Sequence, residues 1–248
     1  MQKPDTQRGM SLISLMVALA IGIFLLAGLF QVWYQTRLTF SSQGQLAQLE
    51  DNQRMALTMM ANTVQTGGYY PVHLNYPTPS GTTYSANLFP AAGSMILTQY
   101  LYGTHDTTTN ADTLTVRFIA DKSTSDSTTL DCQGQSEPTG TIVTNVYKID
   151  TANSNKLACS TDGGNTFLPV IQGSLNSMAI TYGVDTLGDG TALQYLTADK
   201  VQALTLWSRV LSVKIALTFN NPLFGQPGAA GQTATLPTIT RIVAITHS

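Results

Sequence analysis

A long apolar segment near the N-terminus is the strongest feature of the hydrophobic pattern. From Met10 to Phe30 the chain reads MSLISLMVALAIGIFLLAGLF, 21 residues without a charged side chain. At the rise of an α-helix this length spans about 30 Å, which matches the hydrocarbon core of a bilayer. Trp33 and Tyr34 follow, as interfacial aromatic residues do, and the uncharged stretch ends at Arg37. We therefore predict a membrane-spanning helix.

The pattern stays helical beyond the membrane segment. Mostly apolar residues recur every three or four positions, at Leu46, Leu49, Gln53, Ala56, Met60 and Val64. No proline occurs between Met10 and Tyr70, and Gly67-Gly68 is a typical helix end. One helix over Met10–Thr66 would be about 85 Å long. The weak helix formers in residues 41–44 (SSQG) predict a bend or local unwinding between its two halves.

From Tyr69 onward, the helical period gives way to alternation of apolar and polar residues. Five runs have the pattern of strands: Asp112–Ala120, Thr141–Ile149, Ser177–Tyr182, Leu211–Phe219 and Thr238–Thr246. The stretch Val201–Val210 fits either a strand extension or a short helix. Asp162-Gly163-Gly164 predicts a hairpin turn. The predicted fold class is therefore α+β, with a long N-terminal helix, membrane-spanning in its first half, packed on an antiparallel β-sheet head.

The charge of the chain excludes some functions and orients it in the membrane. Only 10% of the 248 residues are charged and the net charge is −2, which argues against nucleic-acid binding because no basic surface would neutralise phosphates. Lys3 and Arg8 precede the apolar segment, so the positive-inside tendency predicts a cytoplasmic N-terminus. The chain would then cross the membrane once, with the rest of the chain on the opposite side. A plain signal anchor remains an alternative for this segment.

The two cysteines, Cys132 and Cys159, lie 27 residues apart and neither has a second cysteine or a histidine nearby. In an oxidising compartment this predicts a disulfide rather than a metal site or a catalytic thiol. A loop of that length would contribute roughly 3 kcal/mol of stability.

Catalytic and cofactor-binding motifs are missing from the sequence. His73, His105 and His247 are scattered, and only His105 has a carboxylate beside it, at Asp106. None of the hydrolase, metalloprotease, phosphate-loop or CxxC motifs is present. We therefore predict a protein that is not an enzyme and has no cofactor.

A weak calcium candidate lies in the sequence YGVDTLGDG, residues 182–190. Asp185 and Asp189 are four residues apart in a glycine-rich stretch, where two carboxylates can face one cation. The ligand pattern is incomplete because Leu187 stands where a carboxylate or amide belongs. The stronger interpretation is a β-turn between strands, with no metal.

The N-terminus resembles a class III prepilin signal. The short leader MQKPDTQRG ends in glycine and runs directly into the apolar helix. The resemblance implies that a prepilin peptidase cuts between Gly9 and Met10 and methylates the new amino terminus at Met10. It further implies that the helix bundles with partner helices in a filament through Leu12, Leu15, Val17, Leu19 and Ile21. The chain then divides into a leader (residues 1–9), a transmembrane and filament-core helix (10–36), a head-packing half of the helix (37–68) and a β-rich head (69–248).

Ser14 departs from the usual prepilin pattern. Pilins generally carry Glu at this position, the fifth after the cut, where it is thought to pair with the amino terminus of a neighbouring subunit. A carboxylate at that depth is costly unless paired, so Ser14 removes both a cost and a docking contact. The substitution is interpreted either as drift or as the mark of a subunit at the filament tip.

Two later stretches resemble minor pilins of the PilW type. One is LEDNQRMAL at residues 49–57, leading to Thr66-Gly-Gly-Tyr69; the other is YGVDTLGDG with Gln194-Tyr195 and the Trp207–Phe219 segment. The region Val72–Asn110 has no such resemblance. The family implies a minor pilin that helps initiate type IV pilus assembly at or near the tip. Its partners would be other minor pilins, the major pilin and a PilY-type adhesin-like tip protein.

Three alternatives remain open from the sequence. A pseudopilin of a type II secretion system is built on the same plan. A membrane-anchored adhesin or binding module would use the Tyr- and Thr-rich loop at Tyr69–Tyr102 as its contact surface. An anchored enzyme is the third, and loss of an activity on changing His105 or Asp106 would indicate it.

Overall fold

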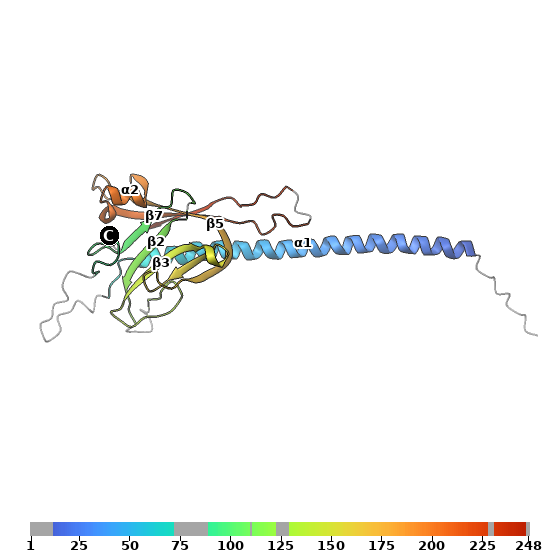
Figure 1. Ribbon diagram of the computed structural model, residues 1–248, viewed down its shortest axis with the longest axis horizontal. Coiled ribbons are helices and arrows are strands. Elements are labelled where there is room, and N and C mark those ends of the chain that lie inside the picture. The colour runs from blue at the N-terminus through green and yellow to red at the C-terminus, as the bar shows by residue number, and fades with distance from the viewer. Residues whose placement is uncertain (1–11, 72–88, 110, 123–128, 228–230, 247–248) are drawn as a thin grey trace, which may run out of the picture.

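The computed structural model describes residues 12–71, 89–109, 111–122, 129–227 and 231–246. A single long helix, α1, emerges from a β-rich head and extends well beyond it (Figure 1). This arrangement confirms the predicted α+β class.

Helix α1 covers Leu12–Thr66, 55 residues, and ends where the sequence predicts. Gly68 takes a left-handed backbone conformation with a φ of 78°, and its N–H donates to the Arg117 carbonyl at 2.9 Å, so the chain leaves the helix and joins the head. The unwinding predicted at residues 41–44 is wrong, because the helix continues through them. The Ser42 hydroxyl instead donates to the Leu38 carbonyl at 2.9 Å, which satisfies it within the helix.

The head contains an eight-stranded antiparallel sheet with the order β1-β2-β3-β4-β5-β7-β8, and β6 pairs with β5 beside this path. Its strands are β1 (Leu101–Thr104), β2 (Thr113–Ile119), β3 (Ile142–Asp150), β4 (Lys156–Ser160), β5 (Leu168–Val184), β6 (Gln194–Thr197), β7 (Val210–Phe219) and β8 (Ile239–Ala244). All five strands predicted from alternation are present, and the Asp162 turn joins β4 to β5 as predicted. The undecided stretch 201–210 is mostly helical, with α2 (Ala198–Ala203) and the 3₁₀ turn η3 (Trp207–Arg209) before β7.

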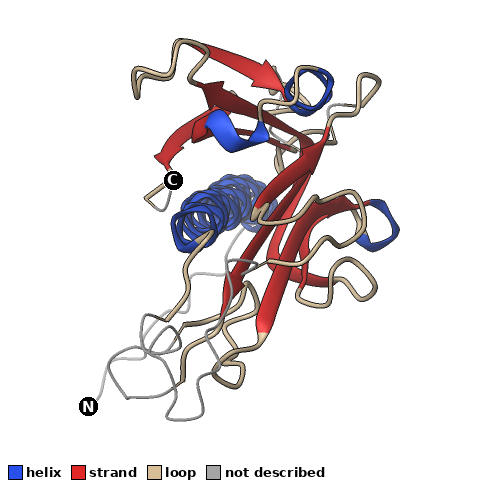
Figure 2. Ribbon diagram, turned by 90° about the vertical axis from the view of Figure 1, so that its left-hand side faces the viewer, coloured by secondary structure: helices blue, strands red, loops and turns tan. Residues whose placement is uncertain are grey.

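Strand β5 connects the two parts of the sheet. Its first part pairs with β4, and its second part pairs with β7 on one edge and with β6 on the other. Seen along α1, the strands curve around the helix, with the helix lying in the concave side (Figure 2). The C-terminal half of α1 is therefore part of the head, whereas the apolar N-terminal part of the helix is not buried by it.

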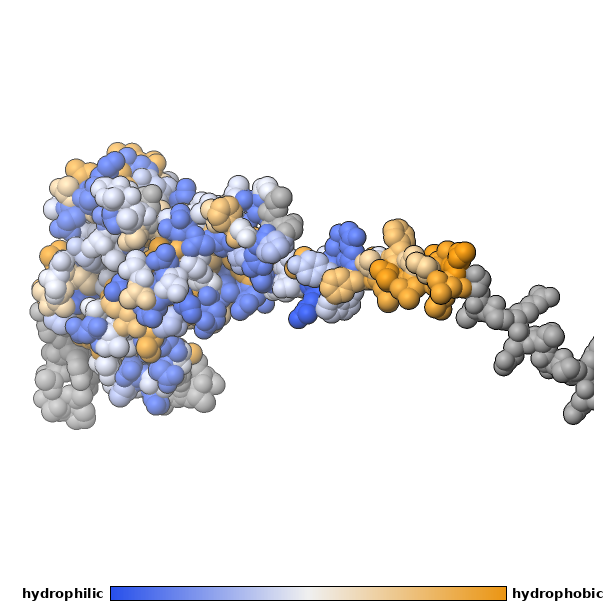
Figure 3. Space-filling model, turned by 45° about the vertical axis from the view of Figure 1, so that its right-hand side comes forward, coloured by the Kyte–Doolittle hydropathy of each residue, from blue (hydrophilic) through white to orange (hydrophobic). Residues whose placement is uncertain are grey.

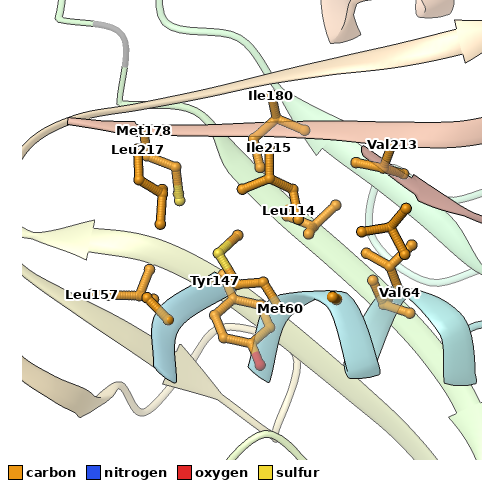
Figure 4. Packing of buried hydrophobic residues seen from close by; sticks show 14 of the residues in the cluster. Met60, Val64, Leu114, Tyr147, Leu157, Met178, Ile180, Val213, Ile215 and Leu217 are labelled. Atoms are coloured by element: carbon orange, nitrogen blue, oxygen red, sulfur yellow. The ribbon is translucent and has the colours of Figure 1, made fainter. Parts of the chain in front are cut away.

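The core forms between the buried stripe of α1 and the inner face of the sheet. Met60 and Val64 point from the helix toward Leu114, Tyr147 and Met178 on the strands (Figure 4). Leu49, Ala56, Met60 and Val64 of the predicted helix face are buried, whereas Gln53 is half-buried and Leu46 is 37% exposed. The predicted face is correct from Leu49 onward, because the sheet covers the helix only from there.

Candidate assembly interface

The N-terminal half of α1 is an exposed apolar surface. The side chains that the sequence assigns to partner packing, Leu12, Leu15, Val17, Leu19 and Ile21, are each between 53% and 74% exposed. The orange half of the helix in Figure 3 stands clear of the head. Removing such a side chain from water is favourable by about 1.5–3 kcal/mol, so this surface needs lipid or partner helices around it. By length and composition, α1 is the one helix in the described residues that could cross a membrane.

The processing site proposed from the sequence, Gly9 and Met10, lies outside the described residues. Cleavage and methylation there remain predictions. Ser14 lies in the first turns of α1 and brings no charge to the apolar surface.

The exposed half of the helix is held to the head through contacts of the other half. The Thr63 hydroxyl and the Tyr147 hydroxyl lie 2.9 Å apart inside the head. Further out, the Asn52 side-chain oxygen accepts from the Gln172 N–H at 3.1 Å, and the Thr246 hydroxyl donates to the Gln65 carbonyl at 3.0 Å. Because the helix is unbroken between the two halves, the head and the apolar surface are mechanically coupled.

The candidate cation loop is a turn held together by Asp185. Its carboxylate accepts the backbone N–H groups of Leu187, Gly188, Asp189 and Gly190. These hydrogen bonds, that from Gly190 foremost, hold the pKa of Asp185 below its ordinary value. The side chain of Asp189 accepts from the Thr191 N–H at 2.9 Å instead of facing Asp185. Asp185 thus stabilises the turn that the sequence favours, and no group of three potential metal-ligating side chains occurs among the residues described.

One paired histidine was missed by the sequence reasoning. The sequence places His105 beside Asp106, whereas the His105 Nδ1 lies 2.8 Å from Oδ1 of Asp112. Asp112 is buried and also accepts the N–H groups of Ile180 and Asp106, which links the start of β2 to β5. A carboxylate directly before an alternating strand was the available signal. The contacts assign this pair to the architecture of the head. His73 and His247 lie outside the described residues.

Two models of known families match this chain, one at its N-terminus and one in its head. A model of the prokaryotic N-terminal methylation motif matches residues 5–30, which include the first part of α1. A model described as type IV pilus-assembly protein W matches residues 142–238, from the start of β3 to the residue before β8. Together, these two matches support a PilW-type type IV pilin.

Further comparisons add no functional detail for this pilin. A search among curated proteins gave no match. Among solved structures, it is similar to a type IV-like pilin from Thermus thermophilus at 14% identity and a TM-score of 0.42, over 79% of this chain and 96% of that one.

The head of this pilin contains the predicted disulfide. Cys132 and Cys159 are joined, with 6.3 Å between their Cα atoms, and both residues are buried. The bond ties the loop before β3 to β4, next to the Asn145 side chain, whose oxygen accepts from the Cys132 N–H at 3.3 Å. A covalent link between these elements suits an extracytoplasmic head.

Proposed function

We propose that this pilin is a minor pilin that helps initiate type IV pilus assembly and sits at or near the pilus tip. It would act there with other minor pilins, the major pilin and a PilY-type tip protein. Its action is docking, and we assign it no catalytic step. The observation that carries the proposal is the apolar half of α1, fully outside the head yet continuous with the helix that the sheet encloses.

Before assembly, lipid covers the apolar half of α1. Assembly exchanges lipid for partner helices, and close packing rather than the hydrophobic effect drives that exchange. Ala18 and Gly22 lie one turn apart on this surface, and a Cβ at Gly22 would meet no atom within 4 Å. This small-residue spacing lets a neighbouring backbone approach closely.

The proposed topology follows from the same helix. The N-terminus is cytoplasmic, the head is periplasmic, and the prepilin peptidase releases the leader between Gly9 and Met10. The pilin then leaves the inner membrane for the pilus on the cell surface.

The tip position is supported by Ser14. A subunit that starts a filament has no predecessor whose amino terminus it must neutralise, so an uncharged side chain serves there. Ser14 also avoids placing an unpaired carboxylate in the apolar layer.

Three readouts test the proposal: the position of the protein on the pilus, the number of pili, and the partners of α1. In cells lacking the native gene but expressing an epitope-tagged copy, immunogold label should lie at pilus ends, and omission of the copy should reduce the number of pili. A photoreactive amino acid at Leu19 should crosslink to other pilins, whereas the same group at Leu187, an exposed residue of the Asp185 loop, serves as the control. Normal piliation without the protein, or crosslinks only to secretion-system components, would contradict the proposal and favour a pseudopilin.

A further inference from the structure

Arg37 is the only charged residue between Leu12 and Leu49, and it forms a stack with two aromatic side chains on one face of α1. The Arg37 guanidinium carbon lies 5.6 Å from the centre of the Trp33 ring, and the rings of Phe30 and Trp33 have centres 5.9 Å apart. The spacing of three and four residues brings these side chains together on the helix surface. Phe30 and Trp33 are more than half exposed, so the stack faces outward.

The stack leaves the hydrogen-bonding edge of Arg37 without a partner among the described residues. A guanidinium that lies over a ring is attracted through its face, and its N–H groups remain available at the edge. The next acidic residue on α1 is Glu50, which is 13 residues and about 20 Å away along the helix. The neighbouring hydroxyls of Thr36 and Thr39 are already satisfied, since they donate to the carbonyls of Val32 and Gln35.

The depth of Arg37 indicates what meets that edge. It lies seven residues, or about 10 Å, beyond Phe30, where the apolar run ends. This is the level of the phospholipid headgroups, where Trp side chains also concentrate. The planar fork of arginine matches the oxygens of a phosphate. We propose that Arg37 binds the headgroup phosphate of a periplasmic-leaflet phospholipid, with Trp33 and Phe30 packed beside it at the membrane interface, and that this contact sets the depth of α1 before assembly.

This inference rests on the membrane-spanning part of the proposed function and not on the tip role. A carboxylate of another pilin is a different partner for Arg37. The lipid is favoured because the aromatic rings and the cation together have the composition of a membrane-interface anchor, and because every copy resides in the bilayer before it meets a partner.

Trp33 reports the depth directly. It is one of two tryptophans, so the full-length protein carrying Trp207→Phe has a single emitter beside Arg37. The protein is reconstituted into vesicles of one part phosphatidylglycerol to three parts phosphatidylcholine, brominated either near the headgroup or near the chain ends. The ratio of shallow to deep quenching gives the position of Trp33. Near-ultraviolet circular dichroism checks that the head of the Trp207→Phe protein is folded. If it is not, the protein with both tryptophans is used, and a Trp33→Phe variant gives the fluorescence of Trp207 to be subtracted.

With Arg37 present, we expect the shallow quencher to be the more effective. Arg37→Gln should lower the shallow-to-deep ratio roughly twofold as the helix settles deeper, and Arg37→Lys should restore part of it. Arg54→Gln, an exposed change further along α1, should have no effect. An unchanged ratio in Arg37→Gln would overturn the phosphate anchor while leaving the proposed function intact. If Arg37 affects the depth of Trp33 only when another pilin supplies a carboxylate, the phosphate anchor is likewise overturned and the proposed function stands. Absence of quenching by either lipid would overturn both.

Discussion

The hydroxyl groups of Thr63 and Tyr147 lie 2.9 Å apart, and this contact joins α1 to β3 inside the head. Both residues are buried, and burial raises the pKa of Tyr147, so the phenol is neutral at any physiological pH. Thr63 also donates to the Met59 carbonyl at 3.0 Å. The contact therefore fixes the rotation of α1 about its own axis relative to the head, and α1 carries the exposed apolar surface.

Thr63→Val should destabilise the head by about 1–3 kcal/mol, because it leaves the buried Tyr147 hydroxyl without a partner. Tyr147→Phe should cost less, since Thr63 keeps its bond to the helix backbone. Thermal unfolding of the detergent-solubilised protein, followed by near-ultraviolet circular dichroism, measures both. Thr66→Val is the matched control, because the Thr66 hydroxyl donates to the Asn62 carbonyl within α1 and the valine change removes only that bond. Equal effects of the valine changes at positions 63 and 66 would show that the contact does not stabilise the head.

Replacing both Cys132 and Cys159 by serine should lower the stability of the head by roughly 3 kcal/mol, because the unfolded chain regains the freedom of a 27-residue loop. The wild-type protein should show the same loss of melting temperature when a reductant is added, and the double variant should not respond to it. A wild-type melting temperature that is insensitive to complete reduction would contradict this.

Asp185→Asn should destabilise the head at neutral pH, because the carboxylate accepts four backbone N–H groups. The folded-state pKa of Asp185 lies below its ordinary value of 3.8, so its contribution is present above that pH and is lost as the pH falls through the lowered pKa. The difference in stability between wild type and variant should therefore shrink below about pH 4.

Urea titrations of both proteins across this range measure the effect, with Asp189→Asn as a control, because the Asp189 carboxylate accepts one backbone N–H, that of Thr191, where Asp185 accepts four. A difference that grows on acidification would contradict the assignment. Calcium should leave the melting temperature unchanged, and protection by calcium that requires Asp185 would restore the cation hypothesis.

Ser14→Glu separates the two interpretations of this position. If Ser14 reflects selection for a tip subunit, the new carboxylate has no amino terminus to neutralise it and piliation should be lost. Counting pili by electron microscopy in the complemented deletion strain measures this, with Ser14→Ala as the neutral control. Normal piliation in Ser14→Glu would show that the position has drifted.

Much of the fold could be predicted because its signals are local. The two glycines at residues 67–68 end α1, and alternation marks the longer strands. The strands β1, β4 and β6 have only four or five residues, too few for a period to stand out, and their pairing comes from their neighbours.

The remaining errors come from contacts between segments that are distant in sequence. Alternation in β2 places Arg117 on the outer face, yet the segment around Gln99 covers it. The Arg117 side chain is buried and donates to the carbonyls of Gln99 and Pro90. The contact of His105 with Asp112 is closer in sequence, seven residues, and depends on the pairing of β1 with β2. Of the candidate interface, the apolar helix was evident from composition, whereas its attachment through Thr63 and Tyr147 depends on the packed sheet.

The state of the N-terminus tests the central claim most directly. The protein is extracted from membranes of cells that contain a prepilin peptidase, and its intact mass and N-terminal sequence are determined, with and without Gly9→Val. We expect a mature chain that begins at N-methylated Met10, and loss of this processing in the variant. A chain that retains Met1, or one cut beyond Phe30, would contradict the assignment of this protein as a processed pilin.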